Sequence, residues 1–189
     1  MDTPVLVITG PSGVGKGTLI RRLLEEVPGS ELSVSATTRK PREGEVNGRD
    51  YHFLDEPEFT ARVERGEFIE HAVYAGNHYG TLRSELQRPA SLILLEIDLQ
   101  GARQIRGTMP EAMQVFIAPP DFADLEQRLL GRGAETPEQI ERRLAVAREE
   151  MAARDEFGQQ IVNDDLDRAA QELIDIAATM CDPQVRTDT

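Results

Sequence analysis

The chain has 189 residues, of which 39% are hydrophobic and 29% charged, which is typical of one folded domain and excludes a disordered chain. Its 34 acidic residues outnumber its 21 basic residues, and a surface with a net charge of −13 repels nucleic-acid phosphates. We therefore expect no nucleic-acid partner, although a small anion can bind where basic residues are concentrated.

The first part of the chain predicts a strand, a turn and a helix, followed by a segment of different character. Val5–Thr9 predicts a buried strand, residues 10–15 a glycine-rich turn, and Lys16–Val27 a helix with one apolar face. Between residues 33 and 81, turns with Pro, Gly and Asn separate short elements, which indicates an insert with its own small sheet. These elements are extended pieces at Leu32–Ala36, Tyr51–Leu54 and Phe68–Val73, and a helix near Pro57–Arg65.

Strands and helices alternate in the second half of the chain. Strands are predicted at Leu92–Ile97, Met113–Ala118 and Ile161–Val162, and helices from about Leu99, at Phe122–Leu130, from Thr136 and at Leu166–Met180. This alternation predicts an α/β fold, in which helices cover both faces of a parallel sheet. We expect a single domain, with a core at 1–32 and 82–189, an insert at 33–81 and a lid at about 124–149.

None of these elements is suited to a membrane. Apolar runs such as Leu92–Leu95 are far shorter than the roughly 20 residues that a bilayer span needs, and no basic stretch of a signal peptide precedes Val5. A lone cysteine, Cys181, cannot form an internal disulfide, which fits a reducing compartment. We expect a cytoplasmic protein without a membrane partner, either a monomer or a homodimer.

The strongest motif runs from Gly10 to Thr18, between the first predicted strand and the first predicted helix. Glycines let backbone N–H groups converge on a phosphate, and the helix N-terminus adds partial positive charge. Lys16 then reaches the β- and γ-phosphates, so the motif predicts a nucleoside triphosphate site; the alternative is a glycine-rich turn with a solvated lysine. The candidate residues are Gly10, Pro11, Ser12, Gly13, Val14, Gly15, Lys16, Gly17 and Thr18.

This motif departs from the usual pattern at one position. A Ser or Thr that ligates Mg²⁺ normally follows the lysine, but here Gly17 follows Lys16 and Thr18 comes next. The sequence therefore leaves open whether Thr18 touches the metal ion directly or contacts it through water.

A basic cluster marks the insert, where four basic residues fall within eleven positions, 39–49. Forked hydrogen bonds from Arg39 and Arg42, with hydroxyls from Tyr51 and Tyr79, suit a second phosphate. The alternative is a solvated loop whose arginines pair with glutamates of the same loop. The residues alone do not decide between these two interpretations.

Together these motifs resemble guanylate kinase, the enzyme family that phosphorylates GMP, from about Pro4 to Met180. The resemblance implies the reaction ATP + GMP ⇌ ADP + GDP with Mg²⁺, a step in purine nucleotide metabolism. We expect dGMP to be accepted as well, because no residue recognisable in the sequence guards the 2′-position of the ribose. It rests on the phosphate loop, on residues 33–51 and on five shorter motifs. These are Glu67-Phe-Ile-Glu70, Asn77-His-Tyr-Gly80, Leu95-Glu-Ile-Asp98, Gly131-Arg-Gly133 and Ile161-Val-Asn-Asp-Asp165.

The resemblance also implies a GMP site, and base recognition agrees with its chemistry. Guanine presents N1–H and N2–H₂ as adjacent donors that a carboxylate such as Glu70 accepts together, whereas adenine would leave that acceptor unmatched. Taken without the resemblance, Glu70 is a surface acid at a strand end. The implied guanine contacts are Ser35, Glu70 and Thr81, and the implied phosphate contacts are Arg39, Arg42, Tyr51 and Tyr79.

Two further positions carry alternative interpretations. Asp98 ends an apolar strand, where it can orient Mg²⁺-bound water or the GMP ribose–phosphate, but it is also a good helix N-cap. Asn163 resembles the family residue near the ATP adenine, but it also suits an Asx-turn or a cap of the final helix.

The segment around Gly131-Arg-Gly133 resembles the lid of nucleoside monophosphate kinases. We expect Arg128 to contact ATP, and Arg132 and Arg143 to neutralise the transferring phosphoryl group together with Lys16 and Arg39. The alternative is a helical hairpin whose arginines pair with nearby glutamates. Two other functions remain open, namely a nucleoside monophosphate kinase for another base and a non-catalytic binding module like those of scaffolding proteins.

Overall fold

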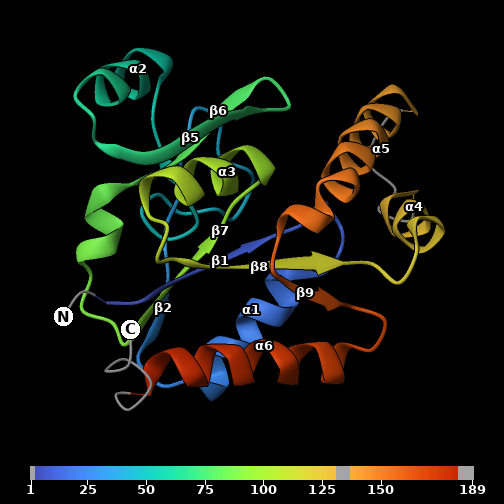
Figure 1. The fold of residues 1–189 in the computed structure, drawn as a ribbon. Coiled ribbons are helices and arrows are strands. Elements are labelled where there is room, and N and C mark those ends of the chain that lie inside the picture. Colours follow the sequence, from blue (N-terminus) through green and yellow to red (C-terminus); the bar gives the residue numbers. More distant parts are fainter. Residues whose placement is uncertain (1–2, 131–136, 183–189) are drawn as a thin grey trace.

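A five-stranded parallel sheet forms the centre of the protein in a computed structural model that describes residues 3–130 and 137–182 (Figure 1). The strand order is β2-β7-β1-β8-β9, and every neighbouring pair is parallel. The predicted α/β fold class is confirmed. The strands are β1 (Val5–Thr9), β2 (Ser30–Leu32), β7 (Leu92–Glu96), β8 (Met113–Ala118) and β9 (Gln159–Val162).

Helices cover both faces of this sheet, because its strands bury side chains on both sides. Leu6 and Ile8 of β1 pack in a cluster with α1 (Lys16–Glu26) and α6 (Leu166–Cys181). The intervening Val7 packs on the opposite face with α3 (Leu99–Thr108). Figure 1 accordingly shows α1 and α6 below the sheet and α3 above it.

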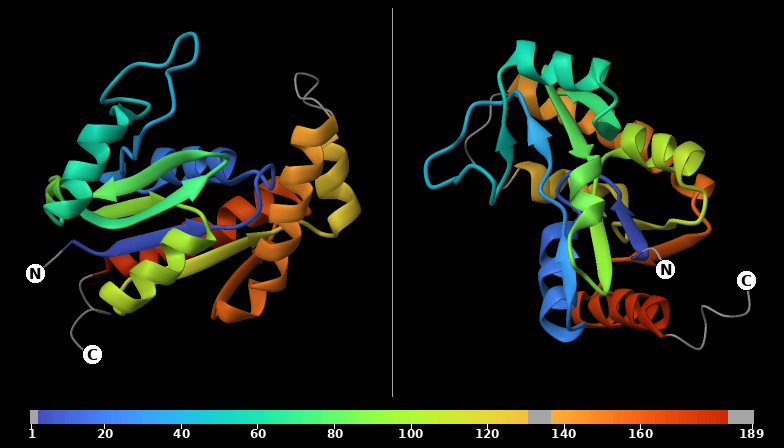
Figure 2. Two further views of the ribbon diagram at one scale, coloured as in Figure 1. Left: turned by 90° about the horizontal axis from the view of Figure 1, so that it is seen from above. Right: turned by 90° about the vertical axis from the view of Figure 1, so that its left-hand side faces the viewer.

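Two helices flank the β8–β9 side of the sheet. They are α4 (Phe122–Leu130) and α5 (Pro137–Ala152), which lie beside each other in Figures 1 and 2. Leu129 of α4 and Leu144 of α5 join the same buried cluster as α1. Short 3₁₀ helices occur at Arg83–Gln87 and Arg154–Glu156. Thr136, where the sequence predicts that the helix observed as α5 begins, lies outside the described residues.

A second, four-stranded sheet stands above the carboxyl end of the first, in the order β4-β3-β6-β5. Its helix α2 (Glu56–Glu64) begins after Asp55, whose side chain accepts the Glu58 N–H, and it packs Phe59 on Phe68 with ring centroids 4.5 Å apart. The strands are β3 (Ala36–Thr37), β4 (His52–Phe53), β5 (Phe68–Tyr74) and β6 (Asn77–Leu82).

The structure corrects two sequence predictions in this region. The single extended piece predicted at Leu32–Ala36 is divided, because Leu32 pairs with Leu94 in the central sheet whereas Ala36 pairs with Gly80 in the second. Strand β6 was missed, because its sequence Asn-His-Tyr-Gly-Thr-Leu has one β-branched residue, Thr81, and no apolar alternation.

Strands β1 and β7 end at the same edge of the central sheet, and this edge determines where a ligand site can form. Ile8 of β1 pairs with Glu96 of β7, so the residues that follow both strands leave the sheet at one edge. That edge is where open parallel sheets bind ligands. Within 3–130 and 137–182, no helix has the length and apolar character of a membrane span.

Candidate active site

One cavity of about 560 Å³ opens at this edge, and its walls come from both sheets. The phosphate loop supplies Gly10, Ser12, Gly13, Gly15, Lys16, Gly17 and Thr18. The second sheet and the segments beside it supply Ser35, Tyr51, Glu70, Tyr74 and Tyr79, and the core adds Asp98 and Glu150. The structure therefore brings most of the predicted residues for both nucleotides to a single space.

The phosphate loop has the backbone geometry of an anion cradle. Gly10 has φ +137° and lies so close to β8 that a Cβ there would overlap the carbonyl oxygen of Ile117. Lys16 Nζ donates to the carbonyl oxygens of Gly10 and Pro11, at 2.6 and 3.3 Å. The carbonyls of the loop itself therefore satisfy the Lys16 ammonium group.

Asn163 supports this loop from behind. Its Nδ2 donates to the buried Val14 carbonyl at 2.8 Å, and a Cβ on Gly15 would lie 2.5 Å from the same nitrogen. Asn163 is buried and is not among the residues that line the cavity. The cap of α6 is Asp165, which accepts the Arg168 N–H, so the alternative that Asn163 caps this helix is wrong.

Three residues near the loop carry oxygen atoms suited to a hard cation. Thr18 lines the cavity on α1, and Asp98 lines it from the end of β7. Asp98 is also the N-cap of α3, where its Oδ1 accepts the Gly101 N–H at 2.8 Å. Buried Glu150 adds an Oε2 without a hydrogen-bond partner. Among the described residues, no group of three or more His, Cys, Asp or Glu side chains is arranged to hold a metal ion.

The candidate guanine pocket is built around a buried carboxylate. Glu70 of β5 is 4% exposed, and its Oε1 accepts a hydrogen bond from Thr81 Oγ1 at 2.7 Å. Burial, with a smaller contribution from the charge of nearby Asp98, raises the pKa of Glu70 to about 7 against the lowering effect of the Thr81 hydrogen bonds. Ser35 lines the same cavity. Glu70 is therefore a buried acceptor rather than a surface acid.

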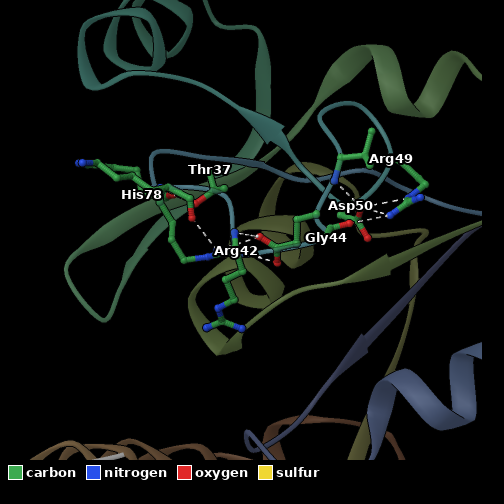
Figure 3. A network of polar contacts seen from close by, with 10 residues as sticks. Thr37, Arg42, Gly44, Arg49, Asp50 and His78 are labelled. Carbon is green, nitrogen blue, oxygen red and sulfur yellow. Dashed lines mark hydrogen bonds and ion pairs between the residues drawn. The ribbon is translucent and has the colours of Figure 1, made fainter. Parts of the chain in front are cut away.

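The basic cluster at residues 39–49 includes a counter-ion for its own arginines. Arg39 donates a forked pair of hydrogen bonds to Glu45, at 2.8 and 3.0 Å, and the Arg42 N–H donates to the same carboxylate at 2.7 Å. Figure 3 shows this network at Arg42, together with the ion pair that Asp50 forms with Arg49. Arg39 thus pairs with a glutamate of its own loop, as the alternative interpretation of this segment predicts. Its planar guanidinium donates two parallel hydrogen bonds, a geometry that also fits a phosphate. The Arg42 side chain is exposed.

Three tyrosines form a row along the second sheet's side of the cavity. The Tyr79 ring stands edge-on to Tyr51 at 6.1 Å and to Tyr74 at 6.4 Å. The Arg39 guanidinium lies 5.2 Å from the centre of the Tyr51 ring. Two of the predicted phosphate-binding hydroxyls, on Tyr51 and Tyr79, therefore lie beside the arginine expected to act with them.

Of the two predicted lid arginines that the structure describes, one reaches the phosphate loop. Arg143 on α5 donates from Nη2 to Ser12 Oγ at 2.7 Å. Arg128 is exposed on α4 and is not part of the cavity wall. Arg132 lies outside the described residues.

Sequence reasoning missed several residues of this site. Tyr74 and Glu150 line the cavity, and Gly101 lies against the Glu70 carboxylate. Glu150 is 6% exposed; burial raises its pKa to about 7, although the charge of Lys16 acts to lower it. The signal for Glu150 was its place one turn after Ala147 on the buried face of α5, where an acid is unusual.

Comparison with known proteins matches this geometry to one family. The family model described as guanylate kinase matches residues 2–179. The chain belongs to the guanylate kinase family. Guanylate kinases transfer a phosphoryl group from ATP to GMP and form GDP, so the resemblance inferred from the motifs is confirmed.

Individual guanylate kinases are similar over most of their length. The chain is 52% identical to a guanylate kinase of Prochlorococcus marinus, over 89% of this chain and 94% of that protein. It is 54% identical to that of Frankia casuarinae, over 89% and 93%. The crystal structure of guanylate kinase from Anaplasma phagocytophilum matches with a TM-score of 0.76 and 32% identity, over 96% of this chain and 88% of that one.

Proposed function

We propose that this chain transfers the γ-phosphoryl group of ATP directly to GMP, and also to dGMP, in the reaction ATP + GMP ⇌ ADP + GDP. The observation that supports it most is the shared cavity, because Lys16 of the phosphate loop and Glu70 of the second sheet line the same space. Two nucleotides bound there face each other, so in-line transfer needs no covalent enzyme intermediate.

We propose that each of the two sheets belongs to the part of the chain that binds one of the nucleotides. The core, at 1–32 and 82–189, binds ATP through its phosphate loop, with Asn163 and Arg128 toward the nucleotide base. The insert, at 33–81, binds GMP. The segment at about 124–149 acts as a lid that excludes water, which would otherwise accept the phosphoryl group.

Recognition of GMP is proposed to depend on a buried acceptor and a phosphate clamp. The ionised Glu70 carboxylate accepts guanine N1–H and N2–H₂, while Ser35 and Thr81 hydroxyls complete the base contacts. For the GMP phosphate to bind, it must replace the Glu45 carboxylate on Arg39, since both anions use the same forked donors. The proposed phosphate contacts are Arg39, Arg42, Tyr51 and Tyr79.

Charge on the moving phosphoryl group is proposed to be neutralised from both sides. Lys16 must leave its two carbonyl partners to reach the β- and γ-phosphates. Arg143 already lies at Ser12, within the loop that holds those phosphates. Arg39 and Arg132 are proposed to complete the set, with Asp98 beside the GMP ribose and phosphate.

The residues present also fit Mg²⁺ bound with ATP. Mg²⁺ keeps several waters and takes one or two protein oxygens beside the phosphates, and the cavity wall offers the Thr18 hydroxyl and the Asp98 carboxylate. A Cβ on Gly17 would meet nothing within 4 Å, so this position has space for a Cβ. The usual hydroxyl is missing because the residue is glycine and not because space is lacking. The Thr18 hydroxyl and the Asp98 carboxylate would hold the ion, which would supply positive charge that offsets the charge of the ATP phosphates.

We also propose that the enzyme works in the cytoplasm, as a monomer or a homodimer. The single cysteine among 189 residues, which cannot form an internal disulfide, supports this location.

A coupled assay of ADP release tests the function. The purified chain is given Mg-ATP with GMP, dGMP, AMP, UMP or CMP in parallel reactions. We expect turnover with GMP and dGMP and little with the other three. AMP as the best acceptor would overturn the guanine assignment, and no ADP formation with any acceptor would overturn the proposed activity.

A further inference from the structure

Strand β5 carries Glu70 at a point where its pairing with β6 is irregular. Phe68 pairs with Leu82 and Glu70 pairs with Thr81, so β5 has one residue more than β6 between these two pairs. Such a β-bulge changes the face of the sheet to which the following side chains point, and bulges of this kind are common next to active sites. The direction of the Glu70 side chain therefore depends on how the bulge is held.

The two faces of β5 show the effect of the bulge. Glu70, Ala72 and Tyr74, at alternate positions, line the shared cavity. In a regular strand Phe68 would point to the same side as these three residues, but its ring stacks on Phe59 of α2 instead. The bulge thus allows β5 to pack Phe68 on α2 and still direct Glu70 into the cavity.

A side chain of the core holds β5 directly after the bulge. In the order β4-β3-β6-β5, β5 is the outermost strand of its sheet. Gln104 of α3 lies at its outer edge, where Oε1 accepts the His71 N–H at 3.1 Å and Nε2 donates to the His71 carbonyl oxygen at 2.7 Å. An antiparallel neighbour strand would exchange the same pair of hydrogen bonds with one residue. The Gln104 amide therefore takes the place of a strand next to Glu70.

Gln104 belongs to a face of α3 that is directed at β5. Gln100 lies four residues earlier, on the same side of the helix, and its Nε2 donates to the Val73 carbonyl oxygen at 3.2 Å. The opposite side of α3 is fixed in the core, because Ile105 is fully buried in the cluster with β1 and β7. Figure 1 shows α3 next to β5. Helix α3 therefore connects the core to the strand that carries Glu70.

We propose that Gln104 is a positioning residue for guanine recognition, whose amide holds the bulged strand so that Glu70 accepts guanine N1–H and N2–H₂ together. The inference rests on the proposed GMP site. Two parallel hydrogen bonds to one carboxylate require both of its oxygens to lie near the plane of the base, so a small rotation of β5 weakens one of them. Gln104 thus contributes to the choice of base, and not only to affinity.

A comparison of GMP with IMP tests this role. The hypoxanthine of IMP keeps the N1–H of guanine and lacks the 2-amino group, so the preference for GMP over IMP measures the second hydrogen bond to Glu70. Calorimetry gives the affinities of both nucleotides for wild type, Gln104→Leu, which removes both hydrogen bonds to His71, and Gln104→Glu, which cannot donate to the His71 carbonyl. We expect the preference to fall about fivefold or more in both variants, with the affinity for Mg-AMPPNP unchanged within about twofold.

Three controls accompany these variants. His71 is exposed, so water can replace the amide, and the melting temperature of Gln104→Leu should stay close to that of wild type. Gln171→Leu makes the same substitution at an exposed amide of α6 and should keep the wild-type preference. In a Glu70→Gln background, Gln104→Leu should cause little further loss, because both changes affect the same contact with the base.

The outcomes separate the role of Gln104 from the proposed function. Three results would overturn that role: wild type binds IMP as tightly as GMP, Gln104→Leu keeps the wild-type preference, or the variant loses affinity for GMP and IMP by the same factor. A fall in the Glu70→Gln background as large as that in wild type would also overturn it, since Gln104 would then act on another contact. The kinase function is judged separately from ADP formation by wild type with GMP, and it fails if no ADP forms, whatever the affinities are.

Discussion

The carboxylate of Glu70 packs against the backbone of Gly101, so closely that a Cβ at position 101 would lie 2.5 Å from Glu70 Oε2. Gly101 is in the first turn of α3, where its N–H donates to the N-cap Asp98. The position of the base-reading carboxylate therefore depends on a missing side chain in a helix of the core. Asp98, Gly101 and Glu70 act as one structural unit between the two sheets.

Gly101→Ala is expected to displace Glu70 and to raise KM for GMP about tenfold or more, while KM for ATP changes little. Alanine favours a helix over glycine by about 1 kcal/mol, so a loss of GMP affinity would not come from a weaker helix. Gly107→Ala is the matched control in the same helix, since a Cβ there meets nothing within 4 Å. Steady-state kinetics of both variants check this, and equal KM values for GMP would contradict the dependence on Gly101.

The raised pKa of Glu70 predicts that GMP affinity depends on pH. Only the ionised carboxylate accepts both guanine donors, and burial raises the pKa of Glu70 to about 7 in the free protein. GMP binding should therefore release a proton and strengthen about tenfold between pH 6 and pH 8. Calorimetric titrations across this range measure the slope. The GMP phosphate also ionises in this range, and the pH dependence of GMP affinity in Glu70→Gln measures that contribution alone. If the affinity of wild type depends on pH no more steeply than that of the variant, the prediction is contradicted.

Glu150 predicts a pH dependence of stability. Burial raises its pKa to about 7, from 4.5 in the unfolded chain, despite the opposing charge of Lys16. The folded state thus holds the proton more tightly, so the free energy of unfolding is highest below about pH 4.5 and falls as the pH rises through 7, by about 3 kcal/mol for this group. Glu150→Gln should remove that fall and be more stable than wild type at pH 8 but not at pH 4.5. Urea unfolding at both pH values measures it, and the exposed neighbour Glu149→Gln should behave like wild type.

Lys16→Ala should lower kcat by roughly a hundred- to a thousandfold or more, because the ammonium group is the mobile charge of the phosphate loop. The melting temperature should change little, since the hydrogen bonds of Lys16 Nζ within the described part of the chain go to two carbonyls of its own loop. Lys40→Ala is the control, because it removes the only other lysine of the chain, which is exposed in the insert. Single-turnover measurements separate binding from transfer, and near-normal turnover of Lys16→Ala would remove the basis for the phosphate-loop proposal.

Local patterns predicted the elements of the core well. The apolar runs of β1, β7 and β8 and the glycine-rich turn before α1 are signals within a few neighbouring residues, and the structure confirms them. The boundary between the two sheets was harder, because Leu32 and Ala36 are both apolar residues in an extended segment. Only their different partners, Leu94 and Gly80, separate them.

The site was predictable where a motif carried its chemistry, and not where a role depends on distant neighbours. Lys16 and Glu70 came from the loop pattern and the family resemblance. Gly101 reads in the sequence as an unfavourable helix residue, and its importance appears only beside Glu70. Tyr74 likewise gains significance only from the cavity that it lines together with the phosphate loop, and no periodicity in the sequence links these two segments.

Asn163→Ala is expected to weaken ATP binding without a comparable effect on GMP. The Asn163 amide donates to the Val14 carbonyl inside the protein, and its nitrogen fills the space beside Gly15. Removing it leaves a buried carbonyl without a partner, at a cost of about 1–3 kcal/mol, and loosens the loop on the side away from the phosphates. Calorimetry with Mg-AMPPNP and with GMP, alongside thermal unfolding, measures both effects, and Gln171→Ala provides a control that removes an exposed amide. Equal losses of affinity for the two nucleotides would show that Asn163 supports the fold in general rather than the phosphate loop.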